Sequence, residues 1–598
     1  MSFKKRGRVA VAGVSLIAVV CGLGLPASAE ESWVEKSNAY SQQLLQLLAK
    51  YNPEQATMVG VASADADVED LRPHVLERQT ADAEKIIAKL KVAMTKETDP
   101  SLKQDLAIMV DALEDGITSE KLHNRVEIPY YNLPQTIYSG FRSLLGPGSD
   151  KSRHEKAVLR LKRYAGLVEG YTPIVQLAEA RTTERLGDKK LIGPYIGEIN
   201  QDFKRMPVFI GGIEKLFKDA GLTGWEDAYA TLKTQLTGYK GFVEKQIVPR
   251  ARQSARLPLP LYQDALKQWG VDATPEQLIA MAQLGYAEIK DEMKALAPLV
   301  AKEKGYKTTD YHEVIKLLKK ENIPGDQVEA FYKHRIDQLE DIARKHNLVT
   351  IPDRKAKVRM MTAAETAANP APNLQPPRFV GGDPDHKEYA TFRLPLLKKN
   401  ADGTWQHTDD TFKATTWTLA AHEARPGHEL QFGAMVDHGV SLARQLYAFN
   451  STNVEGWALY AEAMSKPYMP LDGQLLSLQN RLLRAARCFL DPMLNLGLIS
   501  PADAKRLLKE DVVLGEGWAQ NEIERYTYRM PGQATAYFYG YTKLMALQTE
   551  VQLRLRDKYS AKAFHDFILA QGLLPPDLMR KAVLDRFVPS VLGKKKAS

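Results

Sequence analysis

The spacing of apolar residues constrains the fold of this chain more than any other feature. Over long stretches they recur at steps of three and four residues, the period of an α-helix that buries one face. Thr274 and Pro275 are typical of a helix start, and Pro298 is typical of a helix end. We therefore predict a mostly α-helical protein. The clearest helical stretches are residues 81–94, 155–168, 275–296, 327–346, 473–487, 501–508 and 561–571.

One region departs from the helical pattern. Residues 369–384 are rich in Pro, Asn and Gly, and we expect them to be irregular. Residues 389–396 then read as a strand, 399–404 as a Gly-containing turn, and Trp405 and His407 follow. We expect a small antiparallel sheet there, beside the segment that carries His422. Its edge could hold an extended peptide, or the hairpin could be a structural flap, and the sequence does not separate the two.

The N-terminus has the features of a secretory signal peptide. Basic residues precede an apolar run from Val9 to Leu25, and Ala27-Ser28-Ala29 matches a cleavage site. We expect cleavage after Ala29, a periplasmic or secreted protein, and no stable membrane anchor. The alternative, a retained anchor, is weaker because the apolar run is short for a span and ends in the cleavage pattern. Cleavage leaves one cysteine, Cys488, which excludes an intrachain disulfide and lies in a stretch that reads as a buried helix.

Length and charge narrow the class of protein. The mature chain has about 570 residues, enough for two or more lobes. The net charge of +8 falls to +4 once the four basic residues of the signal are removed, and three of those charges are lysines 594–596. A body this close to neutral gives no support for nucleic-acid binding.

The chemistry is concentrated in residues 422–428. His422, Glu423 and His428 have the order of a zinc hydrolase, in which two imidazoles bind the metal and the Glu takes a proton from water. The histidines are six residues apart instead of four, about 240° around a straight helix at ~100° per residue. Pro426 and Gly427 lie between them and can turn His428 back toward His422. The alternative is a helix end with two polar histidines.

A third metal ligand is expected downstream. Glu455 lies in an apolar, helix-compatible stretch 27 residues after His428, and a buried carboxylate there needs a partner such as a metal. Glu462, seven residues on and on the same helix face, is the alternative ligand. Glu423 is then free to act as a general base. The competing interpretation makes Glu455 a surface or ion-paired residue.

Residues 524–541 form a third block with five tyrosines, two arginines and a Pro-Gly break. A phenol can donate a hydrogen bond to an oxyanion, and an arginine can grip a carboxylate in bidentate fashion. We select Tyr537, Tyr528 and Arg525 as candidates, while aromatic packing in the core explains most of the other residues. A short echo also links residues 455–458 with 516–519, both Glu-Gly-Trp-Ala, and we treat it as coincidence.

The chain resembles the bacterial family known as domain of unknown function 885. The resemblance is carried by residues 419–431, 455–462 and 530–537 and by Phe564 to Leu569 followed by Gly572, and it runs from about Tyr51 to the C-terminus. Arg425 departs from the small or apolar residue of many relatives, at a position where we expect no chemistry.

That family is similar in turn to helical zinc peptidases such as thimet oligopeptidase, angiotensin-converting enzyme and carboxypeptidase Taq. The resemblance implies His422, His428 and Glu455 as Zn²⁺ ligands, Glu423 as the base and Tyr537 as the oxyanion donor. It also implies a deep cleft between two helical lobes, which we expect at about residues 30–370 and 371–598. The Pro-Gly insertion departs from the HExxH motif of those enzymes.

We therefore expect a secreted zinc peptidase that hydrolyses short peptides, of oligopeptidase or carboxypeptidase type. Two alternatives remain: a metal-dependent amidase acting on cell-wall or other amides, and a non-catalytic periplasmic binding or scaffold protein. Convergence of His422, Glu423, His428 and Glu455 would favour an enzyme. The sequence leaves open the substrate sequence, endo- or exo-cleavage and the oligomeric state.

Overall fold

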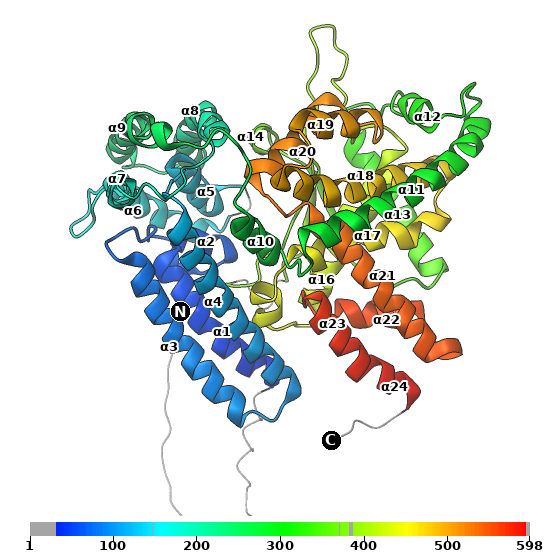
Figure 1. Ribbon diagram of the computed structural model, residues 1–598, viewed down its shortest axis with the longest axis horizontal. Helices are drawn as coiled ribbons and strands as arrows, with labels where there is room; N and C mark the ends of the chain where they lie inside the picture. The colour runs from blue at the N-terminus through cyan, green and yellow to red at the C-terminus, as the bar shows by residue number, and fades with distance from the viewer. Residues whose placement is uncertain (1–31, 148, 370, 382–386, 594–598) are drawn as a thin grey trace, which may run out of the picture.

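The computed structural model describes residues 32–147, 149–369, 371–381 and 387–593 (Figure 1). The predicted signal peptide and lysines 594–596 lie outside these residues. Helices dominate the described chain, which confirms the predicted fold class, and a single three-stranded sheet accompanies them. Across these same ranges, no helix is both long enough and apolar enough to cross a membrane.

The helices of the first half are mostly long and amphipathic. They are α1 (Trp33–Tyr51), α2 (Pro53–Val59), α3 (Val75–Lys96), α4 (Pro100–Val126), α5 (Leu133–Leu145), α6 (Glu155–Tyr164), α7 (Ile174–Leu186), α8 (Ile196–Asp219), α9 (Glu226–Phe242) and α10 (Leu259–Gln268).

The second half holds the longest buried helix, α18, and the candidate site residues. Its helices are α11 (Pro275–Lys304), α12 (Tyr311–Leu318), α13 (Val328–Lys345), α14 (Ala363–Ala368), α15 (Thr415–Glu423), α16 (His428–Asp437), α17 (Ser451–Ser465), α18 (Leu471–Leu496), α19 (Pro501–Glu510), α20 (Glu516–Glu524), α21 (Thr535–Leu555), α22 (Ala561–Leu569), α23 (Pro576–Ala582) and α24 (Val588–Leu592).

Helix α11 shows that local sequence sets a helix start better than its end. Thr274 and Gln277 exchange side-chain to backbone hydrogen bonds at the start, as the predicted cap requires. The predicted end at Pro298 is wrong, because the helix continues to Lys304. Pro298 costs the helix one backbone hydrogen bond, but buried Ala297 and Val300 beside it pack into the core and hold the helix together.

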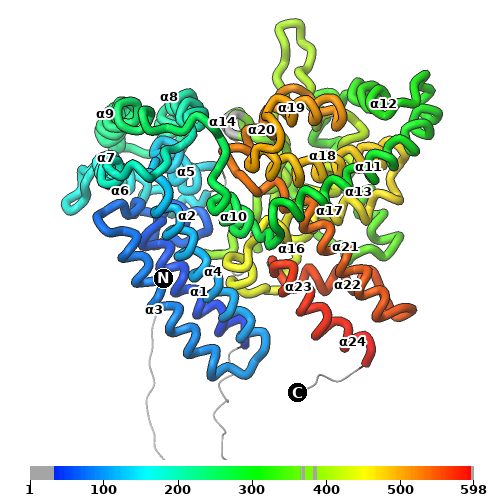
Figure 2. Tube along the Cα trace, viewed as in Figure 1, coloured from blue at the N-terminus to red at the C-terminus, as the bar shows by residue number. Residues whose placement is uncertain are grey.

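Two large hydrophobic cores organise the molecule. One gathers buried residues between 71 and 247, and the other gathers nearly all of its members between 262 and 588. The first group of helices lies on the left in Figure 1, and Figure 2 shows the chain passing to the second group through α10. Helices α11 and α12 share the second core, so the cores divide the chain earlier than the expected boundary near residue 370.

A smaller core ties the N-terminal helices to the second half. Helices α1, α3 and α4 pack there with Ala443 of the π-helical turn η5 (Ala443–Tyr447). Asp105 of α4 is fully buried and accepts hydrogen bonds from Ser37 Oγ at 2.7 Å, Ser441 Oγ at 2.5 Å and Arg444 Nε at 2.7 Å. A buried carboxylate with three donors is satisfied, so this contact is a structural joint.

The sheet differs from the predicted hairpin. Its strands are β1 (Lys357–Met360), β2 (Asn373–Gln375) and β3 (Thr391–Leu394), in the order β1-β3-β2. The β2–β3 pair is antiparallel and the β1–β3 pair is parallel, so the sheet is mixed. Strand β2 lies in the stretch that we expected to be irregular, and the residues after β3 form only an isolated antiparallel bridge, Lys399–Trp405.

Burial explains why β3 pairs in this way. Phe392 and Leu394 are fully buried in a core shared with Trp417 and Ala421 of α15. A hairpin with the polar residues after Lys398 would not cover that face. The sheet therefore packs against the helix that carries His422, as expected.

Helices α17 and α21 touch through their backbones. A Cβ atom on Gly456 would lie 2.7 Å from the carbonyl carbon of Gly540, and one on Gly540 would lie 2.0 Å from the Thr452 oxygen. Only glycine permits such an approach. Glu455 and Tyr537, which lie next to this contact along their helices, are thereby brought to the same region.

Candidate metal centre

A break between two helices brings the two histidines together. Helix α15 ends with His422 and Glu423, and α16 begins with His428. A Cβ atom on Gly427 would lie only 1.9 Å from the His422 carbonyl oxygen, so the chain can fold back there only with glycine. The Pro426 carbonyl accepts a hydrogen bond from Trp457 Nε1 at 3.1 Å, which fixes the break against α17.

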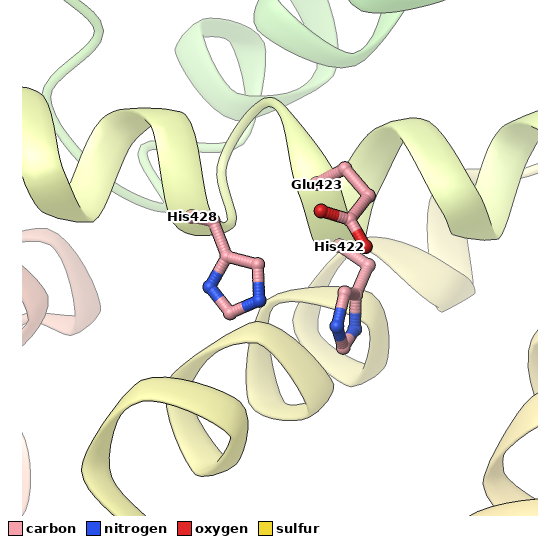
Figure 3. Close-up of side chains that lie close together, drawn as sticks. All are labelled: His422, Glu423 and His428. Atoms are coloured by element: carbon pink, nitrogen blue, oxygen red, sulfur yellow. The ribbon is translucent and has the colours of Figure 1, made fainter. Parts of the chain in front are cut away.

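The imidazoles of His422 and His428 consequently lie close together, edge to face (Figure 3). Their ring centroids are 4.8 Å apart at an interplanar angle of 83°. Glu455 of α17 completes the group, because its Oε2 lies 3.4 Å from Nε2 of each histidine. With metal–ligand bonds of roughly 2.0–2.2 Å, tetrahedral ligand atoms are about 3.3–3.5 Å apart, so this spacing suits zinc.

Two buried atoms in the group lack a hydrogen bond. Among the described residues, neither His428 Nδ1 nor Glu455 Oε2 has a hydrogen-bond partner. Buried polar atoms are normally satisfied, so an unsatisfied carboxylate oxygen between two imidazole nitrogens indicates a site for a cation. Two nitrogens and one oxygen are a donor set that zinc accepts, and a zinc ion held by these three residues would keep a fourth position for water or substrate.

Glu462 is placed behind His422 instead of on the metal side. Its Oε1 lies 2.7 Å from His422 Nδ1, and its Oε2 accepts a short hydrogen bond from Thr418. A carboxylate at Nδ1 holds the proton there and leaves the Nε2 lone pair free toward Glu455. The geometry therefore favours Glu455 as the third ligand over the alternative, Glu462.

The pKa of His422 bears on whether the site could hold a metal at a given pH. Burial disfavours the charged imidazole, but the carboxylates of Glu455 and Glu462 outweigh it and raise the pKa of His422 to about 9. A histidine ligand must be neutral, so a metal ion binding here would displace a proton, and its binding would weaken as the pH falls.

Glu423 lies beside the ligand atoms and is more exposed than the histidines. Side-chain atoms of Glu423, His422 and His428 lie within 4.8 Å of one another (Figure 3). Burial raises the pKa of Glu423, and the two imidazoles limit the rise. A carboxyl group whose pKa moves toward neutrality is suited to accepting and returning a proton. Glu455 rather than Glu423 is the better third ligand, because one Glu455 oxygen lies close to both Nε2 atoms.

Tyr537 of α21 stands over the same site. Its ring lies 6.3 Å from the His422 ring, at an angle of 15°. Its hydroxyl oxygen accepts a hydrogen bond of 2.9 Å from Arg525 Nη2, which also donates to Gln533. Arg525, expected to grip a substrate carboxylate, is therefore turned toward Tyr537.

Tyr528 is not brought into this group. It belongs, with Arg525, to the π-helical turn η7 (Arg525–Arg529), but its ring lies 5.5 Å from Tyr195 of the first half. Tyr528 lines a groove of about 660 Å³ that η7 forms with α2, α5 and α8, between the two groups of helices.

Arg425 has a structural role. It is fully buried, and it donates to Glu429 at 2.7 Å and to Glu340 at 2.6 Å. These contacts anchor the break between α15 and α16, in line with the expectation that this position carries no chemistry.

Sequence reasoning missed three groups around the site. Thr418 orients Glu462, and Glu522 and Arg487 form a buried ion pair close to Tyr537. The spacing of Glu462 from Glu455 was a signal for a role on that helix face. Nothing in the sequence marks Glu522, because its ion-pair partner Arg487 comes from another helix, α18.

Known structures share this fold. The crystal structure of a "putative lipoprotein" from Colwellia psychrerythraea matches with a TM-score of 0.75 and 19% identity, covering 94% of this chain and 100% of that one. A "putative lipoprotein of unknown function" from Shewanella oneidensis matches with a TM-score of 0.73 and 18% identity, covering 93% and 100%. No curated protein matches the chain. The family model for bacterial proteins of unknown function, DUF885, matches residues 53–583, which is nearly the whole described chain. The protein therefore belongs to that family.

Proposed function

We propose that this protein is a zinc-dependent hydrolase of short peptides that acts outside the cytoplasm. The observation that carries the proposal is the convergence of His422, His428 and Glu455, with 3.4 Å between the Glu455 oxygen and each imidazole Nε2. A scaffold protein would have no need to bury two imidazoles around a carboxylate oxygen that lacks a hydrogen bond.

The chain's own residues supply the proton transfers. Glu423 takes a proton from the attacking water and returns it to the leaving amine. Tyr537 donates a hydrogen bond from its hydroxyl group to the oxyanion that develops on the substrate carbonyl. When bound, zinc would polarise that carbonyl and lower the pKa of water. Glu462 keeps His422 in the tautomer that ligation requires.

Two features support the location outside the cytoplasm. The N-terminal secretion signal in the sequence and the description of both structural neighbours as lipoproteins support an envelope or secreted location.

A second candidate is an amidase on cell-wall peptides, because the same site would cleave either kind of amide. Digests of a peptide library and of cell-wall fragments, run side by side, separate the two substrates. Release of products from the fragments alone would favour the amidase.

Glu423→Gln tests the proposal directly. The variant keeps the shape of the side chain but cannot accept a proton, so hydrolysis should fall by ~10²-fold or more while zinc stays bound. Zinc content is measured by metal analysis, and turnover with a peptide library. The matched control is Glu550→Gln, which changes a partly buried carboxylate of α21 that pairs with Arg554 and Arg580. Near-normal turnover of Glu423→Gln would remove Glu423 from the mechanism.

A further inference from the structure

Three guanidinium groups surround the ring of Tyr537. The guanidinium carbons of Arg487, Arg525 and Arg484 lie 5.0, 5.3 and 6.0 Å from the ring centroid. A tyrosine packed in an ordinary core does not need such neighbours, because three positive charges are costly to bury together. The three guanidinium groups therefore need an anionic counter-ion, and their position around Tyr537 needs an explanation.

Arg525 controls the hydroxyl group itself. Its Nη2 donates to the Tyr537 oxygen at 2.9 Å, so that oxygen acts as an acceptor. The hydroxyl proton has no acceptor among the described residues and remains available. The same Nη2 donates to Gln533, whose amide donates to Ser451 Oγ at 2.9 Å, at the start of the helix that carries Glu455.

Glu522 of α20 supplies the counter-ion. It is 1% exposed and accepts from Arg487 Nε at 2.6 Å and Arg487 Nη2 at 2.7 Å. It also accepts from Tyr526 at 2.6 Å and Trp518 at 3.3 Å, and it lies 4.0 Å from Arg525 Nη1. Burial opposes its ionised form, but Arg487 and Arg525 outweigh burial and hold the pKa of Glu522 at about 2.

We propose that Glu522 is a positioning residue: through Arg487 and Arg525 it holds Tyr537 with its hydroxyl proton free for the oxyanion of the substrate. The inference rests on the proposed function. Glu522 does not touch the substrate. Its carboxylate keeps one guanidinium on the face of the ring and the other on the oxygen, and without it the two positive charges would repel each other.

A double-mutant cycle tests the proposal, because residues that act through one another are not additive. Tyr537→Phe should lower kcat by ~10²-fold with little change in KM, since the hydrogen bond forms mainly in the transition state. Glu522→Gln should lower kcat by about 10-fold with KM unchanged. In the Tyr537→Phe background, Glu522→Gln should lower kcat by less than about a further twofold. Losses that multiply would overturn the proposal.

The matched control is Asp105→Asn, another fully buried carboxylate that pairs with an arginine, Arg444. If Asp105→Asn lowers kcat by destabilising the protein, that loss should multiply with the loss caused by Tyr537→Phe. If Glu522→Gln does not fold, Arg525→Gln and Arg525→Lys replace it. The lysine keeps a donor and should recover most of the activity that glutamine loses, and equal losses for the two would contradict the proposal.

A readout without turnover separates this inference from the proposed function. In protein labelled with ¹³C at the tyrosine ring carbon that bears oxygen, Tyr537→Phe identifies the Tyr537 resonance. Glu522→Gln and Arg525→Gln should move that resonance, and Asp105→Asn should leave it in place. An unmoved resonance refutes the positioning role, whereas absence of zinc-dependent hydrolysis in the wild type refutes the function alone.

Discussion

The same four residues, Glu-Gly-Trp-Ala, occur twice in this chain, and the two copies lie in opposite surroundings. At 455–458 in α17 the glutamate lies between two buried histidines. At 516–519 in α20 the glutamate is exposed and pairs with Lys505 and Lys509. Both copies are helical, so local propensity is not what separates them.

The neighbouring helices make the difference. Gly456 touches the backbone of Gly540, whereas a Cβ atom on Gly517 would meet nothing within 4 Å. Trp457 is buried and donates to the Pro426 carbonyl, while Trp518 is half-buried and donates to Glu522. A motif of this length therefore specifies a helix, and only the partner that packs against it specifies a role.

The largest contrast is expected at the glutamates. Glu455→Ala should abolish zinc binding, because it removes one of three ligands, while Glu516→Ala should bind about one zinc per chain like the wild type. His422→Ala serves as the positive control for loss. The measurement is zinc content after dialysis, and full occupancy in both Glu455→Ala and His422→Ala would end the zinc assignment.

The glycines should differ in stability. Gly456→Ala forces a methyl group against the Gly540 backbone, and overpacking of this kind costs roughly 1–3 kcal/mol. Gly517→Ala enters open space in a helix and should stabilise the protein by up to about 1 kcal/mol. Urea denaturation measures both. If the two variants unfold at the same urea concentration, the close contact between α17 and α21 is not what holds these helices.

The tryptophans should show the smallest contrast. Trp457→Phe leaves the buried Pro426 carbonyl without its donor, at a cost of about 1–3 kcal/mol. Trp518→Phe removes one of several donors to Glu522, which keeps Arg487 and Tyr526, and should cost less than about 1 kcal/mol. Melting curves rank the pair, and a larger loss for Trp518→Phe would reverse the ranking.

Much of the fold could be predicted because helix patterns are local. The cap at Thr274 and the long amphipathic stretches follow from residues within a few positions of one another. The end of α11 could not be predicted, because the residues around Pro298 pack against other helices and keep the helix intact past the proline. The pairing of β3 could not be predicted either, because β1 and α15 supply the contacts that decide it.

The candidate site, like the fold, could be predicted from the sequence only in part. Pro426 and Gly427 signalled that His428 could return to His422, and the structure brings the two rings together. Glu462 could be placed on the right helix face but not on the Nδ1 side of His422, since that depends on how α15 crosses α17. Glu522 gave no signal, because the bidentate contact that decides its role is with Arg487, 35 residues earlier on α18.

The glycine at 427 has a consequence for how a metal would enter. The backbone at Gly427 lies so close to the carbonyl of His422 that a Cβ atom there would be 1.9 Å from the His422 oxygen, and this contact involves protein atoms alone. Glu462 and Trp457 hold the same elements from the other side. We therefore expect packing alone to set the candidate ligands in place, so that an entering zinc ion would have little chain to order. Folding and metallation would then be separate events, unlike in a zinc finger, where the ion itself drives the folding.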